Sequence, residues 1–160
     1  MKSLIQTVMV AVSGSEASVN AAKYGIVMSQ LYRLRLVGVY VVDTATLREL
    51  LLSKIFVEEE SSEYEKSLED NGRRYLNYVQ DLAAKKGVQM ERIMRRGTIS
   101  TEIVEAAEEV GADLILLGGF EEGKSNRDVL SRQRREIVRN AKCSVLVVKE
   151  PAIDLIYNRS

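Results

Sequence analysis

The sequence contains no histidine, one cysteine and one proline among its 160 residues. Without histidine, the chain lacks the commonest general base, the usual zinc ligand and every Ser-His or Cys-His nucleophile arrangement. The single cysteine, Cys143, excludes a disulfide within the chain and is typical of a reducing cytoplasm. We therefore expect neither a histidine-dependent hydrolase nor a disulfide-stabilised secreted domain.

Net charge and long apolar runs are absent as well. The 23 basic residues balance 23 acidic residues, so the overall charge does not favour nucleic acid or an acidic surface as a partner. No apolar run approaches the ~18–20 residues that a membrane-spanning helix needs, and the N-terminus lacks a signal-peptide pattern. The sequence predicts a cytoplasmic protein with no nucleic-acid partner and no direct membrane insertion.

The sequence does contain a regular alternation of strand and helix patterns. Apolar, β-rich runs predict strands at 4–12, 34–42, 88–95, 113–117 and 144–149. Helical spacing predicts helices at 15–33, 58–86, 99–110 and 132–141, with a short helix or a flap at 44–57. This alternation predicts an α/β fold, a five-stranded, mostly parallel sheet with helices on both faces. We expect one domain over residues 1–149 and a C-terminal tail at 150–160.

The turn Ser13-Gly14-Ser15 follows the first predicted strand and precedes a helix, which is where parallel sheets bind ligands. Two nucleotide-handling families begin with such a turn. ATP pyrophosphatases that release AMP carry S-G-G-x-D-S there, whereas this chain has Ser15 for the second glycine and Ala17 for the aspartate. An AMP-forming ATP pyrophosphatase is therefore the distant alternative.

The evidence for the second family is a set of short sequence segments in a fixed order. They are residues 14–18 (GSEAS), 39–43 (VYVVD), 97–115 with its ADLI, and 143–148 (CSVLVV). In these segments the chain resembles the universal stress protein family over residues 4–149. The resemblance implies a Rossmann-like, adenine-nucleotide alpha-hydrolase-like fold. It also implies a binding or regulatory module without efficient catalysis, and ATP or AMP as the nucleotide of the pocket.

The resemblance also implies a nucleotide site and shows where this chain departs from it. The candidate site residues are Ser13, Val41, Gly118, Gly119, Gly123 and Arg132, with Arg132 on phosphate. Ser13 replaces the aspartate that contacts adenosine in nucleotide-binding members. The family's phosphate loop reads G-x-x-G-x9-G-[S/T], and here Glu121 replaces its second glycine while Ser131-Arg132 replaces the final pair.

These departures predict impaired or altered ATP binding. A carboxylate about 4 Å from a phosphate costs roughly 4 kcal/mol at an effective dielectric constant near 20. A micromolar affinity amounts to roughly 8 kcal/mol, so one such repulsion removes much of it. The main alternative is a family member that still binds ATP or AMP, with slow or no hydrolysis. The sequence contains no pair of carboxylates typical of acid–base catalysis and no cluster of residues with metal-ligand spacing. We therefore name no catalytic residue and no metal ligand.

Two surfaces of the predicted fold are candidates for partners. The last strand is apolar and a candidate for the sheet edge, and an uncovered edge strand pairs readily with another chain. The resemblance implies the same contact, so we predict a homodimer through Val145, Leu146, Val147 and Val148. The helix at 58–86 is longer than covering a small sheet requires, which leaves an unidentified protein partner as an option. The resemblance adds the option that the domain regulates a membrane transporter, since domains of this family occur fused to transporters.

Overall fold

The computed structural model describes residues 3–119 and 129–160, without side chains at 129–131. Five strands form one sheet in the order β3-β2-β1-β4-β5, and each neighbouring pair is parallel. Their bounds are β1 (Thr7–Ala11), β2 (Arg35–Val42), β3 (Met90–Arg96), β4 (Leu114–Gly118) and β5 (Ser144–Val148). The predicted α/β fold with a five-stranded parallel sheet is confirmed.

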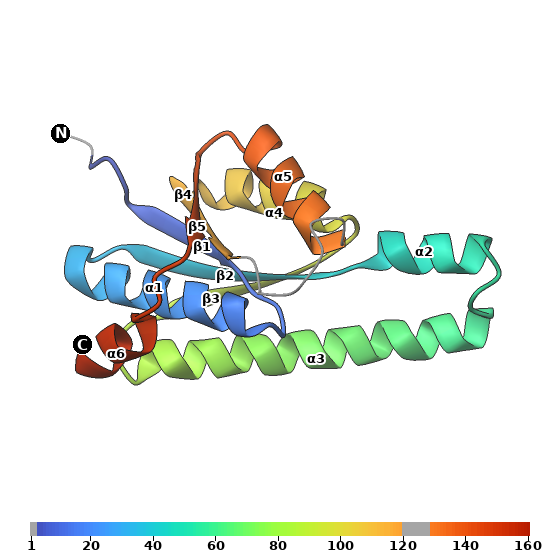
Figure 1. Ribbon diagram of the computed structural model, residues 1–160, viewed down its shortest axis with the longest axis horizontal. Coiled ribbons are helices and arrows are strands. Elements are labelled where there is room, and N and C mark those ends of the chain that lie inside the picture. The colour runs from blue at the N-terminus through green and yellow to red at the C-terminus, as the bar shows by residue number, and fades with distance from the viewer. Residues whose placement is uncertain (1–2, 120–128) are drawn as a thin grey trace.

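Helices cover both faces of the sheet (Figure 1). One face carries α1 (Glu16–Tyr32), α3 (Glu58–Ala84) and α6 (Ile153–Arg159), and the other carries α4 (Ile99–Val110) and α5 (Val129–Asn140). Successive residues of β1 point to opposite cores, since Val8 and Val10 pack below the sheet and Met9 packs above it. A strand buried on both faces is apolar at every position, which is why these strands read as continuous apolar runs.

The remaining helix, α2 (Thr44–Leu52), lies beyond the carboxyl end of the sheet. Its N-cap is Asp43, whose carboxylate accepts hydrogen bonds from the N–H of Thr46 at 3.1 Å and from its hydroxyl at 2.7 Å. The N-terminal half of α3 runs back beneath α2, so the two helices extend together past the strands (Figure 1). The segment 44–57, expected as a short helix or a flap, is a helix followed by a loop.

The segment 150–160, expected as a tail, contains α6, which packs against α1. Ile153 and Tyr157 are buried, and Asp154 forms an ion pair of 2.6 Å with Lys23 of α1. With seven residues and two buried side chains, α6 is too short for hydrophobic periodicity to reveal it. The C-terminal segment therefore stabilises the domain instead of trailing from it.

We expect the variant Tyr157→Phe to lower the free energy of unfolding by about 1–3 kcal/mol, because it leaves a buried carbonyl without its donor. The Tyr157 hydroxyl donates to the carbonyl of Leu82 at 2.7 Å. That carbonyl lies in the last turn of α3, where the N–H of Lys86 donates to Ala83 instead. Urea denaturation measures the change. The control is Tyr78→Phe at a half-exposed tyrosine of α3, and equal effects of the two variants would contradict this role.

Candidate functional site

A cavity of about 230 Å³ lies at the carboxyl ends of β1, β2 and β4. Its floor is the end of the sheet, and its walls come from the turn after β1 and from helices α4 and α5. The aliphatic side chains around it are Ala11, Val12, Ala17, Val39, Val41, Leu68, Ile99, Ile103, Leu117 and Ile137. A concave, mostly apolar site with a few polar groups is the usual form of a small-molecule pocket.

Serine side chains form the hydrogen bonds within the turn at 13–15. The hydroxyls of Ser13 and Ser15 lie 3.0 Å apart, and Ser15 caps α1 by accepting from the N–H of Ser18 at 3.1 Å. The Ser18 hydroxyl accepts from the N–H of Ser13 at 2.7 Å and lies 3.3 Å from the carbonyl of Ala11, to which it donates. These hydroxyls therefore hold the strand-to-helix turn in shape, as helix capping requires.

The backbone of Val41 points into the cavity. Alternate residues of a parallel strand direct their N–H and C=O groups to the same neighbour. The carbonyl of Val39 faces β1, since it accepts from the N–H of Val12 at 2.7 Å, while the carbonyl of Val42 accepts from Gly97 after β3 at 3.1 Å. Val41 therefore faces the β1 side, where the pairing of the two strands has ended at Ala11 and Val39. One donor and one acceptor are thus presented to the cavity.

Gly118 is required by a close approach between β4 and the start of α1. A Cβ at this position would lie 2.7 Å from the carbonyl carbon of Ala17 and 2.8 Å from its oxygen. Because those atoms belong to the backbone, they move only if the first turn of α1 moves. Gly118 therefore sets the width of the cavity between β4 and α1.

The structure brings together three of the predicted nucleotide-site residues, Ser13, Val41 and Gly118, around this cavity. Gly119 lines a separate groove beside Val148, whose carbonyl oxygen would lie 2.7 Å from a Cβ on that glycine. Arg132 lies in a polar groove between α2 and α5. Gly123 and Glu121 lie outside the described residues, and the side chain of Ser131 is not among those described.

Other residues of the cavity were not predicted from the sequence. Gln133 of α5 lines it and accepts from the N–H of Ser100 at 2.7 Å, which ties α5 to the start of α4. Tyr40 also lines it, and burial raises the pKa of this phenol. The inward-facing Ile103 and Ile137 follow ordinary helical spacing, so their sequence signal is that of core residues.

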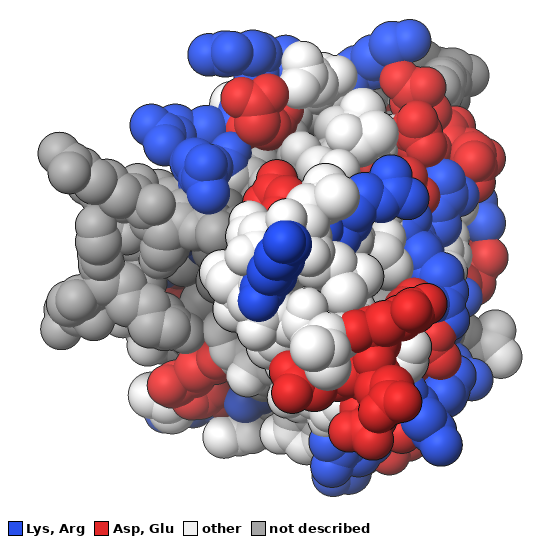
Figure 2. Space-filling model, turned by 90° about the vertical axis from the view of Figure 1, so that its right-hand side faces the viewer, with Lys and Arg blue, Asp and Glu red and all other residues white. Residues whose placement is uncertain are grey.

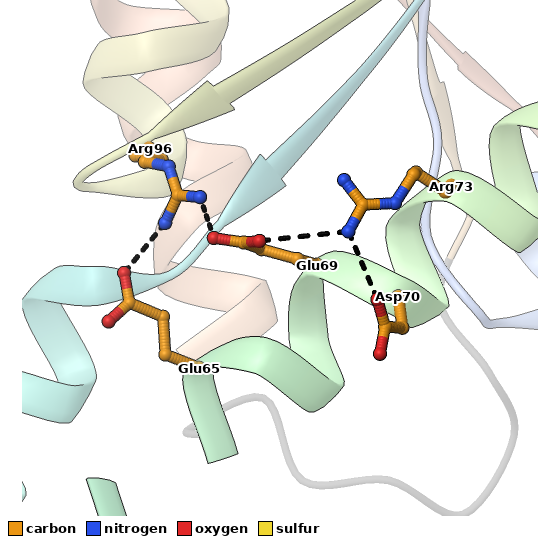
Figure 3. Close-up of polar contacts among 5 residues, drawn as sticks. All are labelled: Glu65, Glu69, Asp70, Arg73 and Arg96. Carbon is orange, nitrogen blue, oxygen red and sulfur yellow. Dashed lines mark hydrogen bonds and ion pairs between the residues drawn. The ribbon is translucent and has the colours of Figure 1, made fainter. Parts of the chain in front are cut away.

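The arginines at the end of β3 are engaged in ion pairs. Arg95 contacts three glutamates of α4, and its hydrogen bond to Glu102 is the main reason that its pKa is raised. Arg96 contacts Glu65 at 2.7 Å and also Glu69, both on α3 (Figure 3). Figure 3 also shows the chain of contacts continuing from Glu69 through Arg73 to Asp70. The ion pairs of Arg96 therefore connect the protruding part of α3 to β3, and those of Arg95 connect β3 to α4.

The described residues offer little for metal or thiol chemistry. Within 3–119 and 129–160, no group of three or more histidine, cysteine, aspartate or glutamate side chains lies close enough to hold a metal ion. Burial raises the pKa of the Cys143 thiol, which disfavours the reactive thiolate. None of the helices in the same ranges is long and apolar enough to cross a membrane.

Comparisons with known proteins agree on one family. The model of the universal stress protein family matches residues 5–149. A universal stress protein of Methanocaldococcus jannaschii is 30% identical, over 94% of this chain and 85% of that protein.

Solved structures of the family share the fold. A universal stress family protein from Burkholderia pseudomallei has a TM-score of 0.71 and 23% identity, over 94% of this chain and all of that one. A universal stress family protein from Arabidopsis thaliana, solved with AMP bound, has a TM-score of 0.64 and 19% identity, over 93% of this chain and 94% of that one. The family match, the sequence relative and the fold lead to one conclusion: the chain belongs to the universal stress protein family.

Proposed function

We propose that this protein is a cytoplasmic binding module that holds the adenosine part of an adenine nucleotide in the cavity. The observation that carries this proposal is the N–H and C=O pair of Val41, presented inside an apolar cavity. Adenine offers a matching edge, since its ring nitrogen N1 accepts a hydrogen bond and its N6 amine donates one. The AMP bound to the Arabidopsis relative supports the same class of ligand.

We propose further that the phosphates contribute little to the affinity. In the phosphate loop, the sequence has Glu121 and Ser131 where the family pattern has glycines. A carboxylate beside a phosphate costs roughly 4 kcal/mol at an effective dielectric constant near 20. The role that follows is binding and regulation, with no efficient turnover of ATP.

The test of the adenosine proposal is calorimetric titration with adenosine and with guanosine. We expect adenosine to bind at least about tenfold more tightly, a difference of about 1.4 kcal/mol. Guanine carries its donor and acceptor in the opposite order along this edge, so it cannot pair with Val41 in the same orientation. Equal affinities, or no binding of adenosine, would overturn the proposed function.

We also propose that the protein is a homodimer joined through β5. This strand is one edge of the sheet, and its residues Val145, Leu146 and Val147 are only half-buried. The opposite edge, β3, exposes charged residues such as Glu91 and Arg92 instead, which discourage pairing with another strand. Light scattering at high micromolar concentration should give the mass of two chains, and the mass of one chain would contradict this arrangement.

A further inference from the structure

Apolar side chains are exposed where the end of α2 turns back into α3. Leu52, Ile55, Val57 and Tyr64 are 78%, 65%, 59% and 47% exposed, respectively, and we call these four residues the corner patch. Figure 2 looks at this end of the molecule, where a largely white surface faces the viewer. Apolar residues that gather in this way mark interaction sites more often than single exposed ones do.

The corner patch lies outside the core that the fold needs. Both α2 and the first half of α3 extend past the strands, so neither of the two cores of the sheet contains a residue of the patch (Figure 1). Contacts of α3 and of Phe56 nevertheless connect the patch to the rest of the molecule. The rings of Phe56 and Tyr64 are 5.6 Å apart, and the ion pairs of Arg96 with Glu65 and Glu69 hold α3 against the sheet. A surface already held in place loses less entropy when a partner binds.

The charged residues next to the corner patch in the sequence are mostly negative. From Arg48 to Lys66 the sequence has six acidic residues and three basic ones, Arg48, Lys54 and Lys66, although the whole chain has no net charge. The acids Glu58, Glu59, Glu60 and Glu63 are exposed beside the patch. Figure 2 shows a cluster of acidic side chains at the lower right of the white surface, with basic side chains beside it and one across the white surface.

From this combination we propose that the corner patch binds a basic, amphipathic segment of another protein. Apolar side chains of that segment pack on Leu52, Ile55 and Val57, and its lysines or arginines lie over the acids of α3. Charge complementarity of this kind steers association and selects the partner. The same acids repel an anionic membrane, a nucleic acid or the equivalent surface of a second copy. The helix α3 packs on β2 and β3, whereas β5 is the opposite edge strand of the sheet. A dimer formed through β5 therefore leaves the patch free.

The test uses a fluorescently labelled synthetic peptide of about 18 residues, with leucine and lysine at helical spacing, titrated with the full-length protein. We expect a Kd below about 100 μM by fluorescence anisotropy. The variant Leu52→Ser/Ile55→Ser should weaken binding at least tenfold. The matched control is Leu31→Ser/Tyr32→Ser, which changes two residues 68% and 67% exposed at the far end of α1 and should bind as the wild type does. The charge variant Glu58→Lys/Glu59→Lys should also weaken binding and reduce its dependence on salt.

The inference is overturned if the amphipathic peptide does not bind, or if a scrambled peptide of the same composition binds equally well. It is also overturned if the corner variant and the control variant lose the same affinity for the peptide. Binding of the wild type to vesicles of anionic lipid would identify a membrane as the occupant. A smaller mass of the corner variant in light scattering would identify a second copy. All the substituted side chains are exposed, so each variant should keep the melting temperature of the wild type to within a few degrees.

Discussion

The double variant Glu121→Gly/Ser131→Gly should bind ATP with Mg²⁺ at least tenfold more tightly than the wild type, while its affinity for adenosine stays unchanged. The substitutions restore the two glycines of the family's phosphate loop and remove one carboxylate from it. Full relief of a repulsion of roughly 4 kcal/mol would exceed a hundredfold, so tenfold is the lower bound of the effect. Calorimetric titration with ATP and with adenosine measures both affinities.

The control for this variant is Glu108→Gln, which removes one exposed acid of α4 that pairs with Lys142. It changes the total charge by the same amount, so it should leave the affinity for ATP unchanged. If the double variant gains affinity for adenosine and ATP alike, the gain does not come from the phosphates. If it gains none, the loop has been assigned to the wrong residues.

The variant Gly118→Ala should lower the free energy of unfolding by about 1–3 kcal/mol and weaken the binding of adenosine at least tenfold. The new Cβ would lie 2.7 Å from the backbone of Ala17, so the first turn of α1 must move away from β4. That turn carries Ser15 and Ser18, which hold the cavity wall through their hydrogen bonds. Urea denaturation and calorimetry measure the two effects.

A glycine outside the cavity separates the two effects of Gly118→Ala. Gly111 ends α4 with a φ of +68°, and no atom lies within 4 Å of a Cβ built there. The variant Gly111→Ala should also cost about 1–3 kcal/mol, because alanine is strained in the left-handed conformation. Its affinity for adenosine should equal that of the wild type. Equal losses of affinity in the two variants would show that Gly118 affects the cavity only through general stability.

Much of the fold could be predicted because strands and helices leave different patterns. Strands such as β1 and β4 are buried on both faces, so their apolar runs stand out and alternate with helices of 3.6-residue spacing. The sequence predicted that the short helix before the last strand begins at about 132, whereas α5 begins at Val129. It gave no signal for α6, because a seven-residue helix that buries only Ile153 and Tyr157 has too few apolar positions to show a period.

The candidate site could be predicted only in outline. Parallel topology places the turn at 13–15, the end of β2 and Gly118 at one edge of the sheet, and the structure has all three around one cavity. The sequence could not show that Gly119 and Arg132 lie outside this cavity. The grooves that these two residues line depend on how β5 and α2 pack beside them. Nor could it identify Ile103 as a cavity residue, because core and cavity wall share the same helical spacing.

The most direct measurement of the central claim is a pair of calorimetric titrations of the wild-type protein, one with adenosine and one with ATP and Mg²⁺. The account predicts that adenosine binds and that the triphosphate adds less than about tenfold to its affinity, or about 1.4 kcal/mol. If ATP binds a hundredfold more tightly than adenosine, the account is contradicted. The phosphate loop would then still bind phosphates despite Glu121 and Ser131.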